Sequence, residues 1–222
     1  MILGSRRRKE SAVTMLEVIV LVALMAIIAG MLLPTICRPS RASASRINCV
    51  NNLKNVGLAF RIFTTDHGGQ WPWQLSGTNG TKDTLAEPGS GWRHFQFVSN
   101  ELSSPRVLLC PSDKERRMAT NFSTFGPNNL SYFLGLQADE TRPQTILAGD
   151  RNVTTNGMDV GPGLLLLGTN QNAGFSKKIH HSAGNVLAGD GSVQQCTSSG
   201  FQDSVVDAVM ASTNAINRLL IP

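Results

Sequence analysis

A single carboxylate, that of Glu17, stands at the head of an uncharged stretch that runs from residue 18 to residue 36. A carboxylate within an apolar helix costs a few kcal/mol or more unless it is paired or has a function. Cleavage between Ala12 and Val13 would place a new α-amine four residues before Glu17. An ammonium and a carboxylate at that spacing can neutralise each other between neighbouring helices. The spacing therefore predicts a charge pair between neighbouring helices.

Histidines and loop carboxylates are the next residue types that could bind ions or catalyse a reaction. The histidines fit no recognised zinc spacing, so we expect no metal site from them: His67, His94, His180 and His181. Calcium binding remains an alternative, although the sequence has no EF-hand spacing. Its ligands would be oxygen atoms of four residues in loop-rich stretches: Asp150, Asn152, Asp159 and Asp190. The sequence contains neither a Gly-x-Ser-x-Gly elbow nor a phosphate-binding loop. We therefore predict no enzymatic activity and no cofactor.

His180 is followed, after nine intervening residues, by Asp190 and Gly191. The Asp-Gly pair lies between two strand-like stretches and predicts a two-residue type I′ hairpin, because such a turn needs positive φ at both positions. His180 would lie one strand or loop away and hydrogen-bond to that turn. We interpret the three residues as a structural motif rather than as a catalytic or metal-binding pair.

The cysteines allow a covalent link between the N-terminal half of the chain and the rest. Cys49 lies in a helix-like stretch and Cys110 precedes a turn, and the two could form a disulfide in an oxidising compartment. Two reduced, buried thiols are the alternative. Four cysteines allow three full pairings, and we expect Cys37 to stay free.

Composition excludes several classes of protein. The chain has 222 residues and a formal charge of +5, with 41% hydrophobic residues, which excludes a disordered chain. The first twelve residues hold four basic groups and one acidic group, hence +3, which leaves only +2 for the other 210. The basic character therefore belongs mostly to a leader, and we expect no nucleic-acid partner.

Residues 13–36 form the most apolar part of the chain. At ~1.5 Å per residue, a helix of this length would cross a ~30 Å hydrocarbon core. The basic residues before it predict an N-terminus in the cytoplasm. A signal peptide cut after Ala44 and an ordinary single-pass anchor are the alternatives, and neither gives Glu17 a role.

The rest of the chain predicts a helix followed by a head rich in short strands. Apolar residues recur every three or four positions from Ile47 to Phe63, which predicts an amphipathic helix within 37–69 that continues the apolar one to about Thr65. Residues 70–222 would form a small antiparallel sheet, with strands at 92–98, 105–110, 145–148, 164–167, 185–188 and 192–196. A C-terminal amphipathic helix is predicted over 203–220. The predicted fold class is α+β.

Four elements together resemble the type IV pilin and type II secretion pseudopilin superfamily, in particular a prepilin-type group found in planctomycetes and verrucomicrobia. The first is the leader with Ala12, Val13 and Thr14-x-x-Glu17, although the family usually has Gly before the cut and Phe or Met after it. The others are the run Arg46–Ala59, the sequence Cys110-Pro-Ser-Asp, and His180-x9-Asp190-Gly191.

The resemblance implies a pilin-like fold, in which one long N-terminal helix packs on a small antiparallel head. It implies a leader over 1–12, a transmembrane half over 13–36, an amphipathic half over 37–69 and a head over 70–222. A prepilin peptidase would cut between Ala12 and Val13, Val13 would be N-methylated, and Glu17 would act in assembly.

The function implied is that of a structural subunit in a type II secretion or type IV pilus-like filament. Its partners would be the peptidase, other pilin or pseudopilin subunits, the inner membrane and the secretion or pilus machinery. The protein would cross the inner membrane once, with its head in the periplasm. The alternative is an anchored or secreted periplasmic binding or enzyme module that uses its N-terminus only as an address.

Overall fold

The computed structural model describes residues 14–36, 41–85, 87, 89–212 and 215–222, and in the first two helices it describes side chains for residues 14–31 and from residue 44 onward. The predicted leader, Ala12, Val13 and Cys37 lie outside the described residues. The chain divides into two units, 1–40 and 41–222.

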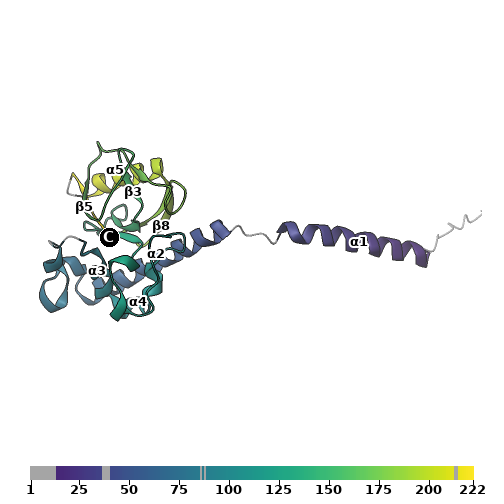
Figure 1. The fold of residues 1–222 in the computed structure, drawn as a ribbon, viewed down its shortest axis with the longest axis horizontal. Helices are drawn as coiled ribbons and strands as arrows, with labels where there is room; N and C mark the ends of the chain where they lie inside the picture. Colours follow the sequence, from purple (N-terminus) through teal and green to yellow (C-terminus); the bar gives the residue numbers. More distant parts are fainter. Residues whose placement is uncertain (1–13, 37–40, 86, 88, 213–214) are drawn as a thin grey trace, which may run out of the picture. The chain divides into compact units, whose positions relative to one another are not determined.

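The first unit contains the helix α1, Met15–Ile36 (Figure 1). The helix begins where the amides of Glu17 and Val18 donate to the carbonyl oxygen of Thr14. Its described side chains, from Thr14 to Met31, are all exposed. Glu17 is the one charged residue among them and lies in the first turn.

The membrane predictions are contradicted. Within the described part of the chain, no helix combines the length and the apolar character needed to cross a membrane. The predicted transmembrane half over 13–36 and the predicted single-pass location in the inner membrane are therefore corrected.

The second unit begins with α2, Arg41–Asp66. Its buried stripe includes the predicted positions Leu53, Val56, Phe60 and Phe63, together with Cys49. Ile47, the first residue of the predicted stripe, is 55% exposed. Two glycines with positive φ, Gly68 and Gly69, follow its C-terminal end. The predicted single helix over 13–65 is wrong, because α1 ends at Ile36 and α2 begins at Arg41. The sequence between them includes Pro39, which lacks the amide N–H of a continuous helix.

A six-stranded antiparallel sheet forms the centre of the second unit, with the order β5-β9-β1-β2-β7-β8, and β4-β3-β6 form a second antiparallel sheet. The strands are β1 Tyr132–Gly135, β2 Ile146–Asp150, β3 Val153–Thr155, β4 Met158–Asp159, β5 Gly163–Leu167, β6 Ala173–Phe175, β7 Ala183–Ala188, β8 Val193–Thr197 and β9 Asn217–Ile221. The other helices are α3 Gly91–Phe97, α4 Ser99–Leu102 and α5 Ser198–Ala211, with short 3₁₀ turns η1 Pro72–Gln74, η2 Gly77–Asn79, η3 Lys82–Thr84, η4 Pro105–Leu108, η5 Phe122–Thr124 and η6 Pro127–Asn129.

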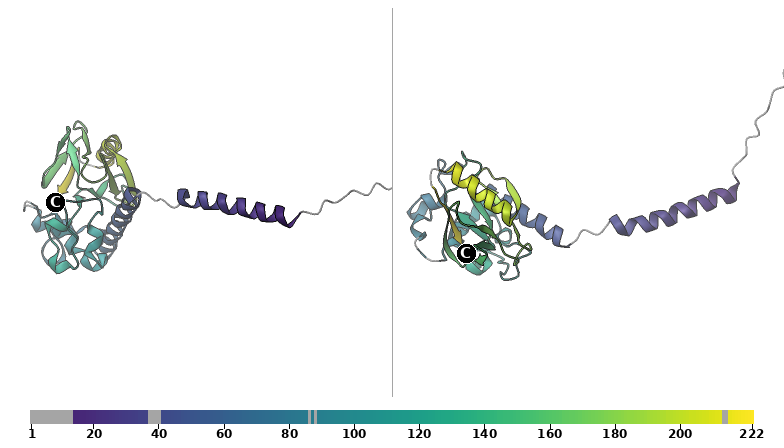
Figure 2. Two further views of the ribbon diagram at one scale, coloured as in Figure 1. Left: turned by 45° about the vertical axis from the view of Figure 1, so that its right-hand side comes forward. Right: turned by 90° about the horizontal axis from the view of Figure 1, so that it is seen from above.

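The six-stranded sheet separates two hydrophobic cores. Because successive side chains of a strand point to opposite faces, Tyr132 and Leu134 of β1 join the core under α2, whereas Phe133 joins the core under α5. Leu187 and Val186 of β7 divide in the same way. Figure 2 shows α2 and α5 as separate covers of the strands. The predicted helix on a small sheet is thus replaced by a large sheet covered on both faces.

Several predicted elements are corrected. Residues predicted as a strand at 92–98 form the helix α3, and those at 105–110 begin with the 3₁₀ turn η4. The predicted helix over 203–220 ends at Ala211, and Asn217–Ile221 form β9 instead. The strand β9 lies between β1 and β5, so its backbone groups complete the ladders of both neighbours. This pairing outweighs the helical spacing of the apolar residues.

The hairpin between β7 and β8 also differs from the prediction. The amide of Gly191 donates to Ala188, and Ala188 donates to Ser192, so three residues rather than two form the loop. Gly191 has φ +87°, but Asp190 does not have positive φ, which excludes a type I′ turn. The Asp190 carboxylate instead accepts a hydrogen bond from the amide of Ser192 at 2.8 Å.

Candidate functional site

A disulfide joins Cys49 of α2 to Cys110, which follows η4. The Cα atoms are 5.1 Å apart, and both side chains are fully buried. Cys49 reaches this place as a member of the α2 stripe that faces the core. One turn later, Asn52 donates its amide to the carbonyl oxygen of Leu109 at 3.0 Å, which holds the second segment against the helix. Of the two alternatives for these cysteines, the structure therefore has the disulfide.

The imidazole of His180 lies against this disulfide. Its Nε2 is 3.4 Å from Sγ of Cys110 and 3.5 Å from Oδ2 of Asp150. Only 3% of His180 is exposed. Its carbonyl oxygen accepts a hydrogen bond from Nη2 of Arg46 on α2. The two residues that follow, His181 and Ser182, have φ of 55° and 64°, and this tight loop directs His180 into the interior.

Asp150 ends strand β2 and is completely buried. Its Oδ2 accepts hydrogen bonds from the backbone amide and the side-chain amide of Asn185 on β7, at 2.7 and 2.8 Å. Its Oδ1 has no hydrogen-bond partner among the described residues. Burial raises the pKa of Asp150 to about 7 and lowers the pKa of His180 to about 4, because a buried site favours the uncharged form of each group.

An ion pair adjoins this cluster and fastens the Cys110-Pro-Ser-Asp segment to the end of β2. Arg151 binds both carboxylate oxygens of Asp113, at 2.8 and 2.9 Å, and Ser131 donates to the same carboxylate. Burial alone would raise the pKa of Asp113, but hydrogen bonding and the charge of Arg151 outweigh it and hold the pKa below its usual value. The pair is structural, since Asp113 is buried with both oxygens bound, and Arg151 also binds Glu115 at 2.8 Å.

The buried cluster brings together a disulfide, an imidazole and a carboxylate, held by Asn185 and Arg46. We call Cys49, Cys110, Asp150 and His180 the disulfide–histidine cluster. Its sulfur, nitrogen and oxygen atoms are metal-ligand types, but the bond between the two sulfur atoms withholds both thiolates. The cluster can therefore offer thiolate ligands only when its disulfide is reduced.

The structure separates the predicted His180 and Asp190 motif. Asp190 lies on the exposed β7–β8 loop, where its carbonyl oxygen accepts a hydrogen bond from Nη1 of Arg61. His180 makes no hydrogen bond to this loop among the described residues; its contacts are with Cys110, Asp150 and Arg46. Glu17, the predicted assembly residue, lies exposed on α1, and its predicted partner Val13 lies outside the described residues.

The remaining candidate ligands are dispersed. His67 stacks on Phe63, His94 is buried against Thr81, and His181 is exposed. The four oxygen ligands considered for calcium have unrelated partners: Asp150 binds Asn185, Asn152 binds the carbonyl oxygens of Ser176 and Ala183, Asp159 pairs with Lys178, and Asp190 binds Ser192. The described residues therefore do not assemble that calcium set.

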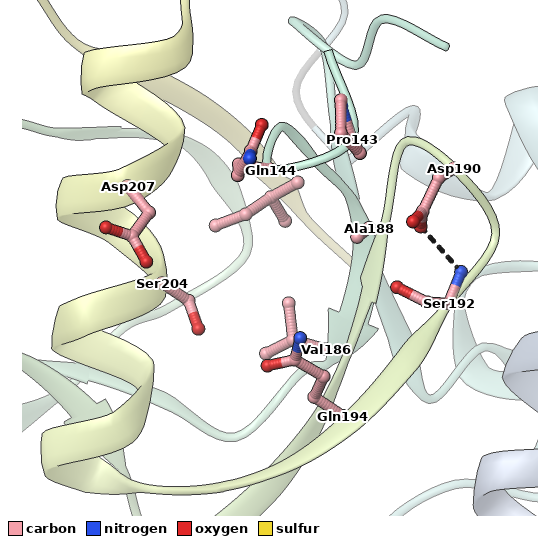
Figure 3. A pocket seen from close by; sticks show the side chains of 10 residues that line it. Pro143, Gln144, Val186, Ala188, Asp190, Ser192, Gln194, Ser204 and Asp207 are labelled. Atoms are coloured by element: carbon pink, nitrogen blue, oxygen red, sulfur yellow. Dashed lines mark hydrogen bonds between the residues drawn. The ribbon is translucent and has the colours of Figure 1, made fainter. Parts of the chain in front are cut away.

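A cavity of about 220 Å³ opens on the other face of the sheet, between α5 and the β7–β8 hairpin (Figure 3). Ser204 and Asp207 project from α5, and Gln194 from β8, above an apolar floor that includes Val186. Its lining contains carboxylate, amide and hydroxyl groups but no thiol or imidazole. It is thus separate from the disulfide–histidine cluster.

Sequence reasoning paired Cys49 with Cys110 but missed that His180 and Asp150 meet them. His180 is 70 residues from Cys110 and 134 from Arg46, so no local spacing marks the cluster. No family model, no curated protein and no solved structure matches the chain.

Proposed function

We propose that the chain is a structural subunit of a type II secretion or type IV pilus-like filament, matured by a prepilin peptidase between Ala12 and Val13. The observation that carries the proposal is the exposed apolar surface of α1, with one carboxylate, Glu17, in its first turn.

The described apolar surface of α1 requires a partner surface that excludes water from it. Twelve large apolar side chains between Met15 and Met31 are each at least 49% exposed. Burying one such side chain contributes about 1.5–3 kcal/mol. A helix that is apolar on all sides is stable in water only when other elements surround it. Packing against α1 helices of neighbouring copies would bury this surface around the whole circumference.

Glu17 would set the register of such packing. Transfer of its carboxylate into an apolar filament core is costly unless a cation meets it. Cleavage after Ala12 would create an amine at Val13, and the amine of one subunit would neutralise Glu17 of the next. Only one stagger between neighbouring helices satisfies both charges, so the pair would select that stagger.

The second unit, 41–222, would form the part of each subunit outside the filament core. It has two hydrophobic cores of its own and a disulfide that ties α2 to the head. These features support a role as a rigid head carried by the assembling helix.

Maturation is tested first, by co-expression of the full chain with a prepilin peptidase and measurement of the intact mass. We expect the loss of residues 1–12, and we expect Ala12→Phe to block it. Ala44→Phe is the matched control, because it alters the alternative signal-peptide site and should leave the mass change intact. An unchanged wild-type mass, or a new N-terminus at Ser45, contradicts the proposal.

Assembly is tested with Glu17→Gln, which removes the charge and keeps the shape. Breaking one partner of a buried pair costs ~3–5 kcal/mol, so we expect incorporation into sheared filaments to fall by about two to four orders of magnitude. Glu10→Gln makes the same change in the segment removed by cleavage and should have no effect. Equal filament incorporation of the wild type and Glu17→Gln would refute the role of Glu17.

A further inference from the structure

We propose that the disulfide–histidine cluster is a zinc site when its disulfide is reduced, with Cys49, Cys110, His180 and Asp150 as the four ligands. The disulfide and the bound metal would be two alternative states of one site. This inference does not depend on the filament role, because every ligand belongs to the second unit.

The distances from His180 to its two neighbours fit tetrahedral coordination. A tetrahedral zinc ion with ordinary bond lengths holds a thiolate sulfur and an imidazole nitrogen about 3.5 Å apart, and a nitrogen and a carboxylate oxygen about 3.4 Å apart. In the structure, Nε2 of His180 is 3.4 Å from Sγ of Cys110 and 3.5 Å from Oδ2 of Asp150. Ligand atoms of Cys49, Cys110 and His180 all lie within 4.8 Å of one another. Asp150 is outside this group of three and reaches the site through its contact with His180.

Two changes remain, a separation of the sulfur atoms and an approach of the Asp150 carboxylate to them. When their bond is cut, the two thiolates repel each other and can separate to the about 3.8 Å that they take on one zinc ion. Both belong to segments that are already held together independently of the disulfide, by the hydrogen bond from Asn52 to Leu109. Reduction can therefore open the site without moving the helix away from the turn.

The surroundings match what zinc ligands need. Two thiolates and one imidazole are a donor set that favours zinc over the hard cations calcium and magnesium. Asn185 holds the Asp150 carboxylate through two hydrogen bonds, the kind of outer contact that orients a ligand. Asp150 is fully buried and its Oδ1 has no partner among the described residues, so a cation beside it would offset a costly group.

The conversion balances when a dithiol is the reductant. The dithiol loses two electrons and two protons and becomes a disulfide, while the Cys49–Cys110 bond is cut and each sulfur gains a proton. Zinc binding then releases both protons from the thiols, because the thiolate is the ligand. Oxidation by a disulfide reverses the sequence and expels the ion.

The test uses the full chain with Cys37→Ser and Cys196→Ser, so that the two cluster cysteines are the only thiols. The chain is reduced with a water-soluble phosphine, which takes oxygen from water and becomes the phosphine oxide. Co²⁺ is then added as a spectroscopic probe, and Zn²⁺ is measured by competition with a coloured chelator. We expect one ion per reduced chain, thiolate-to-cobalt charge transfer with tetrahedral bands, and no such binding by the oxidised chain.

His180→Gln is the decisive variant, and His181→Gln, an exposed neighbour, is its matched control. Loss of an imidazole ligand should weaken Zn²⁺ binding at least about tenfold and alter the cobalt spectrum, whereas the control should match the parent. Equal affinity of the two variants overturns the proposal, as does binding that is independent of reduction. A reduced chain whose circular dichroism shows unfolding that Zn²⁺ does not reverse also overturns it.

Discussion

Loss of the Cys49–Cys110 disulfide should strongly destabilise the second unit. The bond joins residues separated by 61 positions, and it closes a loop that contains most of α2, α3 and the turns up to η4. Chain entropy predicts a contribution of about 4 kcal/mol for a loop of this length. The double variant Cys49→Ala with Cys110→Ala should therefore lose about 4 kcal/mol of unfolding free energy, or slightly more, because a small cavity is left behind.

Urea unfolding of the full chain, in a non-ionic detergent that covers α1 and with EDTA present, measures this loss. With a typical slope of about 2 kcal/mol per molar urea, the midpoint should fall by about 2 M. Cys196→Ala is the matched control, since Cys196 is a buried free thiol whose removal opens no loop. If the double variant shifts the midpoint no more than this control does, the loop-closure reasoning is refuted.

Three further changes test the surroundings. Burial lowers the pKa of His94 to about 4. The contribution of the neutral imidazole to stability is complete above pH 6.5 and is lost as the pH falls from there through 4, by about 3 kcal/mol. His94→Asn should flatten the stability–pH curve in this window, and an unchanged slope would contradict the assignment. Gly135→Ala should cost about 3 kcal/mol or more, because a Cβ there would overlap a backbone carbonyl of β2, whereas Gly161→Ala, with open space around it, should change the midpoint of unfolding very little. Arg151→Met should cost ~3–5 kcal/mol by leaving Asp113 buried and unpaired; a double-mutant cycle with Asp113→Asn should show coupling, and simple additivity would count against the pair.

Local patterns predicted the elements whose stability depends on neighbours in the chain. The apolar stripe from Ile47 to Phe63 predicted a helix, and it coincides with α2, because a period of three and four residues needs only one apolar partner surface. The stretches at 164–167 and 185–188 lie in β5 and β7, and the stretch at 145–148 overlaps β2 from Ile146 onward. The same patterns were wrong where pairing with distant strands determines the secondary structure. Asn217–Ile221, predicted as part of a helix, form a strand between β1 and β5.

Some features of the candidate sites follow from the sequence alone, and others depend on the folded structure. The sequence by itself determined that the chain begins with a basic stretch, a carboxylate and a long apolar run, since these depend only on residue type and order. It also identified Cys49 and Cys110 as a candidate pair. The six-stranded sheet and the loop geometry at Asp190 were decided by backbone pairing and packing.

Only the tertiary structure decided what surrounds the disulfide. Asp150 and Asn185 meet because β2 pairs with β7, and His180 reaches them because the loop before β7 turns inward at His181. These contacts join residues 30 to 70 positions apart. Their closeness depends on strand order and on burial against α2, and no spacing along the chain encodes a distance that only the folded packing creates.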